Sequence, residues 1–402
     1  MSSPDGKVFS ILGKNIKANS KADLEPYLTE LAELADVEEV HFGGNSLGVE
    51  ACEAIAEVLK GKTSLKIVDL ADVFTGRLIS EIPQALSALC NALIDNKNLV
   101  ELDLSDNAFG GRCADAMVPF LSQNHYFQRI KLNNTGLGVW GGTVVADALL
   151  KNAEDLKAKG LKSSLRVVVC GRSRLENGSA PHWAAAFAAH GGLTEVHMPQ
   201  DGIRMEGIEQ LAQGLSKNPN LEVLDLQDNT ATRTGTRALV KVLKQWPSLR
   251  ILNLSDCLLG KAGGIALATA LSKGSNTKLE TLKLQYNEFD KRTIEILAVA
   301  ISQHLTVLKE LELNGNQADP EDDCIEEVRK ALALHGHEDA LDDLDDMEEP
   351  ESGDEDEDES EEEEEEEAEA EDTPEAQAGE DDGVAAGVSD GGALKVDTDA
   401  DE

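Results

Sequence analysis

An eleven-residue pattern that occurs ten times constrains the fold of this 402-residue chain more than any other feature. The pattern reads L-x-x-L-x-L-x-x-N-x-φ, where φ is an apolar residue. Clear copies begin at Leu99, Leu221, Leu249, Leu279 and Leu308, and degenerate copies begin at Val37, Leu65, Phe127, Leu165 and Leu193. The ninth positions of successive copies are 28 residues apart in five of nine gaps, and the other gaps are 29, 30, 34 and 38 residues. Such a period is the sequence signature of a protein built from stacked repeats.

Each copy is expected to supply one strand and one helix. In L-x-L the two apolar side chains point into a core and the residue between them points outward, which is the period of a strand. After the copy that begins at Val37, apolar residues recur at helical spacing at Ala51, Ala54, Ile55, Val58 and Leu59. Because one copy cannot bury its own faces, the copies must stack. The pattern predicts an α/β leucine-rich-repeat horseshoe with a ribonuclease-inhibitor-like period of about 28 residues, parallel strands on its concave face and helices on its convex face.

The charge divides the chain into two parts. Residues 338–402 contain 34 acidic residues and one base, Lys395, whereas residues 1–337 contain 43 acidic and 35 basic residues. A segment this acidic cannot bury enough apolar surface to offset the entropy of ordering, so we expect a disordered acidic tail at 338–402. Residues 1–337 should form the leucine-rich-repeat domain, with an N-terminal cap at 8–34 and a C-terminal cap at 322–334.

Composition argues against several classes of function. With a net charge of −41, the chain lacks the basic surface that nucleic-acid binding requires. No apolar run reaches about 18 residues, which argues against a membrane-spanning helix. The start of the chain has no signal-peptide pattern either, so we expect a cytosolic or nuclear protein. The six cysteines are scattered without a CxxC pair, which favours reduced thiols in the core over disulfides or a zinc site.

The eighth position of each copy should lie along one rim, at the C-terminal ends of the strands. Loops at such an edge can bind a partner because they carry little of the packing. These positions are Gly44, Asp72, Asp106, Asn134, Arg172, Gln200, Asp228, Asp256, Tyr286 and Gly315. Because four of the ten are aspartates and one is an arginine, we expect the rim to bind a basic surface. The residue between the two apolar positions of L-x-L, from His41 in the first copy to Glu312 in the last, should form a column on the concave face.

The two longest gaps mark insertions into the repeat. The 34-residue gap includes residues 73–83 and places Arg77 in an enlarged loop of the rim, from which we expect its side chain to project. For an isolated arginine, a solvated or ion-paired side chain is the simpler explanation. The 38-residue gap includes Lys151–Ser164 with four lysines, and we expect an extended helix followed by a loop.

One further motif is typical of a cofactor site. Residues Gly136–Gly141 match G-x-G-x-x-G between a strand and a helix. The segment is one repeat among ten, however, and no acidic residue ends a neighbouring strand at the required spacing. No convincing set of nucleophile, base and orienting group appears, so we expect no cofactor of its own and no catalysis on a small substrate.

Five motifs in register resemble the Ran GTPase-activating proteins. They are Phe74–Leu78 with Glu81–Pro83, Leu102–Gly110, Leu132–Gly138, Gly171–Asn177 and Glu195–Gln200. The resemblance covers the repeats, both insertions and the acidic tail, as in the short fungal form of the family. It implies stimulation of GTP hydrolysis by Ran, the small GTPase of nucleocytoplasmic transport. It also implies a location in the cytoplasm, including the region around the nucleus.

The resemblance further implies which residues act. The arginine of the T-G-R loop matches Arg77, and an asparagine of the L-x-N-N-x-G segment matches Asn134, with Asn133 and Thr135 as neighbouring alternatives. In the family the asparagine is thought to orient Ran's own glutamine while the arginine supports the interface. By residue type alone, Arg77 is also a candidate arginine finger. Apart from the resemblance, partner contacts on and beside the rim are expected at Asp72, Asp106, Asn133, Arg172, Asp228 and Asp256.

We expect a monomer that binds Ran-GTP, alone or with a Ran-binding protein, while the GTPase itself holds GTP and Mg²⁺. The tail could bind basic proteins. The alternative function is that of a non-catalytic acidic leucine-rich-repeat chaperone or scaffold for basic proteins, which would share the repeats and the polyanionic tail. Such chaperones have shorter and fewer repeats, and inhibitor-like scaffolds of similar period usually have many more cysteines. Turnover of Ran-GTP by sub-stoichiometric protein would distinguish activation from binding.

Overall fold

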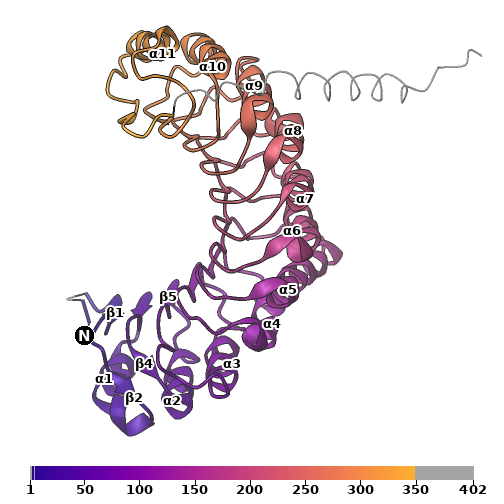
Figure 1. Cartoon of the computed structure of the whole chain (residues 1–402). Coiled ribbons are helices and arrows are strands. Elements are labelled where there is room, and N and C mark those ends of the chain that lie inside the picture. Colours follow the sequence, from indigo (N-terminus) through magenta and orange to yellow (C-terminus); the bar gives the residue numbers. More distant parts are fainter. Residues whose placement is uncertain (1, 4, 349–402) are drawn as a thin grey trace, which may run out of the picture. The chain divides into compact units, whose positions relative to one another are not determined.

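The computed structural model describes residues 2, 3 and 5–348, and its main element is an eleven-stranded parallel sheet with helices on one side (Figure 1). Neighbouring strands follow chain order, and β2 (Lys17–Ala18) and β4 (Ser46–Leu47) pair separately. The strands of the large sheet are β1 (Val8–Ser10), β3 (Glu39–His41), β5 (Ile67–Asp69), β6 (Glu101–Asp103), β7 (Arg129–Lys131), β8 (Val167–Val169), β9 (Glu195–His197), β10 (Val223–Asp225), β11 (Ile251–Asn253), β12 (Thr281–Lys283) and β13 (Glu310–Glu312).

A helix follows each repeat strand, which confirms the predicted leucine-rich-repeat architecture. Figure 1 shows the strands along the inner side of the curved repeat domain and the helices along its outer side. The helices are α1 (Lys21–Glu33), α2 (Val49–Leu59), α3 (Ile82–Ala92), α4 (Ala114–Gln123) after the short 3₁₀ turn η1 (Gly111–Cys113), α5 (Gly138–Ala158), α6 (Glu176–His190), α7 (Met205–Leu215), α8 (Thr232–Leu243), α9 (Gly260–Leu271), α10 (Lys291–Gln303) and α11 (Asp323–Ala333).

The strands pair in the register that the repeat pattern predicts. His41 lies opposite Asp69, Asp69 opposite Asp103, and the column continues without a shift to Glu312 on β13. The residue before each column position, such as Leu102, is buried in the core. The predicted concave column is therefore confirmed.

Buried asparagines at the ninth position join five of the ten repeats to the preceding repeat. The Asn107 Nδ2 donates hydrogen bonds to the carbonyls of Leu70 at 2.8 Å and Leu104 at 2.9 Å. Its Oδ1 accepts from the Val73 N–H at 2.8 Å. A turn between strand and helix exposes backbone groups to the core, and an unpaired buried group is costly, so this amide has a structural role. Ninth-position Thr135, Ser173, Asp201 and Cys257 occupy equivalent buried positions.

The cysteines confirm the prediction of reduced core thiols. All six are free and buried. Burial raises the pKa of Cys52 and of Cys90 to about 12, because the interior disfavours the thiolate.

Both caps form where the sequence predicts them, with β1 and α1 at one end and α11 at the other. The folded region, however, continues beyond the expected boundary at residue 337. Leu341 pairs with Leu311 of β13, and Asp342 accepts a hydrogen bond from the Leu313 N–H at 2.8 Å. Residues up to 348 thus cover the exposed edge of the last strand. The predicted disorder of the tail concerns residues 349–402, which lie outside the described residues.

Both insertions lie where the repeat spacing predicts them. Helix α5 has 21 residues, and the loop that follows it leads to β8. Pro83 lies in the first turn of α3, where its missing N–H costs no hydrogen bond. Within residues 2, 3 and 5–348, no helix combines the length and apolar character needed to cross a membrane.

Candidate functional site

All ten eighth-position residues of the rim adopt a left-handed backbone conformation, with φ between 50° and 73°. For nine of them, from Gly44 to Tyr286, the N–H donates to a carbonyl of the next repeat and continues the sheet beyond the strands. For example, the Asp106 N–H donates to the Asn133 carbonyl at 2.8 Å. Glycine, asparagine and aspartate tolerate this conformation best. The abundance of aspartate on the rim therefore has a backbone cause, and the aspartates alone are weaker evidence for a basic partner than the sequence suggested.

Asn134 lies exposed on this rim, as predicted. Its backbone N–H donates to the Gly171 carbonyl at 2.8 Å, and its side-chain Nδ2 donates to Asp106 Oδ1 at 3.0 Å. These two contacts fix the direction of the carboxamide. No hydrogen bond to its Oδ1 is found within residues 5–348, so the oxygen is available to a partner. Asn134 is therefore a preformed polar group at the edge of the sheet.

The two neighbours of Asn134 differ from it in accessibility. Thr135 is fully buried, and its Oγ1 donates to the Leu132 carbonyl at 2.8 Å. It replaces a structural asparagine and cannot touch a partner. Asn133 is half-buried, and its carbonyl is occupied by the Asp106 N–H. Of the three candidates, Asn134 is the one whose side chain is both exposed and oriented.

Arg77 does not project from the loop, contrary to the prediction. Its half-buried guanidinium turns back toward the first repeat. Nε donates to Ser46 Oγ at 2.9 Å, one terminal nitrogen donates to Asn19 Oδ1 at 2.6 Å, and the other donates to the carbonyls of Ala18, at 2.8 Å, and Ser46. The fork of donors on a guanidinium matches such a set of acceptors. Arg77 therefore anchors the enlarged loop to β2 and β4.

The anchored loop presents apolar side chains that the sequence analysis did not select. Leu78 is 66% exposed and Ile79 is 45% exposed. The loop is held from both sides, because Ser46 Oγ donates to the Thr75 carbonyl at 2.9 Å and Thr75 Oγ1 donates to Asp72 Oδ1. Exposed apolar residues on a fixed loop are typical of a protein–protein contact. The sequence did contain a signal for these two residues, because both lie in an insertion that the repeat itself does not need.

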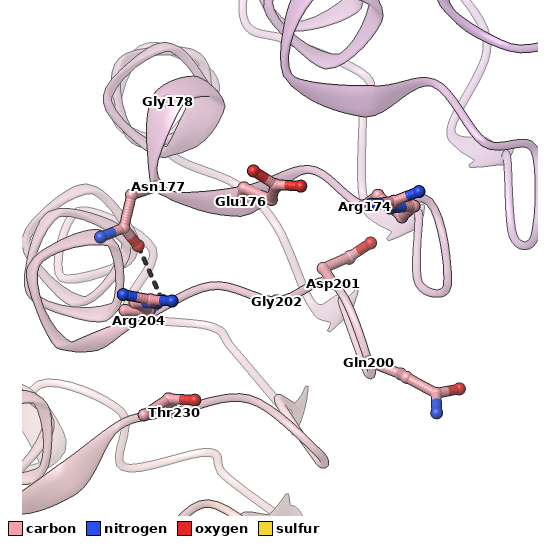
Figure 2. Close-up of a pocket in the computed structure, with 9 residues that line it drawn as sticks. All are labelled: Arg174, Glu176, Asn177, Gly178, Gln200, Asp201, Gly202, Arg204 and Thr230. Carbon is pink, nitrogen blue, oxygen red and sulfur yellow. Dashed lines mark hydrogen bonds between the residues drawn. The ribbon is translucent and has the colours of Figure 1, made fainter.

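A cavity of about 640 Å³ opens at the rim between the starts of α6 and α7 (Figure 2). Arg174, Glu176 and Arg204 line it, together with the buried Asp201. Asp201 is 1% exposed; its Oδ1 accepts from the Ser173 N–H at 2.8 Å, and its Oδ2 has no partner within the described part of the chain. Burial raises the pKa of Asp201 to about 7, against hydrogen bonds that lower it.

One family model agrees with the repeat fold. The Leucine Rich repeat family matches residues 95–117, 217–236 and 247–268. A solved internalin (InlF) from Listeria monocytogenes aligns with 78% of this chain and 82% of its own, at 15% identity and a TM-score of 0.40.

Three curated relatives have related names. Ran GTPase-activating protein 1 of Saccharomyces cerevisiae is 37% identical over 329 residues, covering 80% of this chain and 81% of the relative. Ran GTPase-activating protein 1 of Xenopus laevis is 44% identical over 50% of this chain and 35% of the relative. The Ran GTPase-activating protein of Drosophila melanogaster is 36% identical over 54% of this chain and 37% of the relative. The matches to the two animal relatives thus cover little more than a third of their lengths.

The stacked repeats and the polar rim define a leucine-rich-repeat protein with a long period and one elaborated edge. The match to the yeast relative covers most of both chains. The chain belongs to the Ran GTPase-activating protein family.

Proposed function

We propose that this protein stimulates GTP hydrolysis by the small GTPase Ran, as the names of its relatives indicate. The observation that carries the proposal is the 37% identity to the yeast relative over 80% of the chain. The exposed, oriented Asn134 on the rim supports it, because an activator needs a fixed polar group that can reach the partner's active site.

In this proposal the hydrolysis occurs in the GTPase, and the activator supplies no nucleophile or cofactor. A GTPase already holds GTP, Mg²⁺ and a glutamine that positions water, and it lacks rigidity in the transition state. A stimulation of about 10⁵-fold corresponds to about 7 kcal/mol, which one organised interface can supply. Asn134 is assigned the contact that orients this glutamine and shields the site.

Arg77 is assigned a supporting role instead of that of an arginine finger. A finger must reach the transferring phosphate with free N–H groups, whereas this guanidinium donates to Ser46, Asn19 and Ala18. Its contacts hold Leu78 and Ile79 at the loop surface. Arg77 therefore acts on the partner through the loop, and its loss should weaken the interface as well as the rate.

The other rim residues are proposed to guide encounter. Asp106, Asp228 and Asp256 are exposed or half-buried carboxylates that can attract basic partner surface over several ångströms. Asn133 and Arg172 would add contacts beside them. Asp72 differs, because its carboxylate is bound to Thr75 and holds the enlarged loop.

The alternative function remains a non-catalytic acidic scaffold for basic proteins. Phosphate release from excess Ran-GTP, measured with the protein at about one hundredth of the GTPase concentration, separates the two. Release of many phosphates per molecule of protein supports activation, and binding without accelerated release supports the scaffold. A monomeric state, cytoplasmic location and binding of basic proteins by the tail are further parts of the proposal, each open to direct measurement.

A further inference from the structure

Two arginines without ion pairs line the cavity between α6 and α7 (Figure 2). Arg174 comes from the loop before α6, and Arg204 from the residue just before α7. Both side chains are exposed, and neither forms an ion pair with any other residue in the described ranges. The chain as a whole has an excess of acidic residues, so two arginines without an ion pair in one cavity are a local basic feature.

The backbone that carries the two arginines is held in place before any ligand arrives. Arg174 adopts a left-handed conformation with φ of 56°, which is disfavoured for its side chain. The Arg204 N–H donates to Asn177 Oδ1 at 2.7 Å, the contact drawn in Figure 2, and Arg204 pairs with Thr230 of the next repeat. Asp201 then ties the two loops together, because it accepts from the Ser173 N–H. The backbone of the cavity is therefore preformed, which lowers the entropic cost of ordering its loops on binding.

The charges around the cavity favour an anion. The cavity is lined by two guanidinium groups and by one exposed carboxylate, that of Glu176. Asp201 also lines it but is buried. The Glu206 carboxylate, which does not line the cavity, accepts a hydrogen bond from the Asn177 Nδ2 at 2.7 Å. Helices α6 and α7 both begin at this cavity, and the start of a helix carries a partial positive charge. Arginine forks bind carboxylates in a defined orientation.

We propose that this cavity receives a carboxylate-bearing loop of the bound GTPase, held by Arg174 and Arg204. The proposal rests on the proposed function and deepens it. Acidic rim positions lie on both sides, at Asp106 and at Asp228, so the rim presents an acidic, then a basic, then an acidic stretch. Such alternation fixes the register of the partner, because a shift along the rim would place carboxylate against carboxylate.

The test is the steady-state kinetics of Ran-GTP hydrolysis with the variant Arg174→Ala/Arg204→Ala. We expect KM for Ran-GTP to rise by about 10-fold or more at low salt while kcat stays within about twofold, because the arginines dock the partner and do not touch the reacting atoms. Arg174→Lys/Arg204→Lys should recover part of the loss. An unchanged KM, or a fall in kcat at unchanged KM, overturns the proposal.

A matched control removes the same net charge elsewhere. Lys157 and Lys162 are exposed at the far end of α5 and in the loop after it, and neither has an ion pair in the described part of the chain. Lys157→Ala/Lys162→Ala should leave KM near the wild-type value. An equal rise in KM for both double variants would show a long-range charge effect and overturn the proposal.

Removing the opposing carboxylate gives a change of opposite sign. Glu176→Gln should lower KM, because the cavity then holds fewer negative charges, and a raised KM would count against an anionic ligand. If the wild-type protein itself fails to stimulate hydrolysis, the proposed function has failed. If the wild-type protein is active and the arginine variant keeps its KM, only the cavity proposal has failed.

Discussion

Replacing Asp201 with asparagine should stabilise the protein, and by more as the pH rises. At the equivalent position of the next repeat, Asn229 Nδ2 donates to the carbonyls of Met198 at 2.9 Å and Leu226 at 2.8 Å. A carboxylate oxygen cannot make these bonds, which explains why Asp201 Oδ2 has no partner among the residues described. Asparagine restores the missing donor in nearly the same shape.

The magnitude follows from the pKa. Burial raises the pKa of Asp201 from 3.8 to about 7, and each unit corresponds to about 1.4 kcal/mol. The unfolded chain loses its proton first as the pH rises, while the folded protein keeps it until about pH 7, so the free energy of unfolding falls between these values. The disadvantage of aspartate is about 2 kcal/mol at pH 5 and about 4 kcal/mol at pH 8.5.

Urea unfolding of the wild type and of Asp201→Asn at pH 5 and pH 8.5 measures the difference in their free energies of unfolding. Because the other carboxylates are the same in both proteins, their titration cancels in this difference. The reverse change, Asn229→Asp, is the matched control and should destabilise the protein most at high pH. A stability difference that is the same at pH 5 and pH 8.5, or a variant less stable than wild type at pH 8.5, would refute the assignment of a buried, unpaired carboxyl group.

Three further outcomes are expected. Arg77→Lys should lose most of the stimulation in single-turnover hydrolysis, because one ammonium nitrogen cannot reach all the acceptors that three separate guanidinium nitrogens contact. A wild-type rate would mean that the loop needs no anchor. Asn107→Ala should lower the free energy of unfolding by about 3 kcal/mol or more, because it leaves buried backbone groups unpaired, and urea unfolding will detect it. Asp228→Asn should slow association with Ran-GTP in stopped-flow measurements at low salt and have little effect at high salt; a salt-independent difference would exclude steering.

The repeat period made most of the fold predictable. Because every strand contributes the same three positions, the concave column and the rim position of Asn134 followed from spacing alone. The path of the Arg77 side chain could not be predicted from the repeat spacing, because its acceptors at Ala18 and Asn19 lie almost 60 residues away in sequence. The packing of residues 338–348 was also not predicted. Their composition is mostly acidic, and the few apolar residues that contact the repeats, such as Leu341, do not stand out in it.

Only some of the electrostatic features of the rim could be predicted from the sequence. The rim aspartates suggested a basic partner, but the left-handed backbone is a sufficient reason for much of that composition. Asp201 was visible as a departure from the asparagine consensus, whereas its unpaired oxygen requires the packed neighbours to be known. The cavity with Arg174 and Arg204 forms between two loops that one repeat period separates, so no single motif contains it.

The single-turnover rate of Ran-GTP hydrolysis with saturating Asn134→Ala tests the central claim most directly. If a preformed carboxamide on the rim completes the active site of the GTPase, the rate should fall by about 100-fold or more while the complex still forms, and Asn133→Ala should keep most of the activity. A near-wild-type rate with Asn134→Ala would contradict the account.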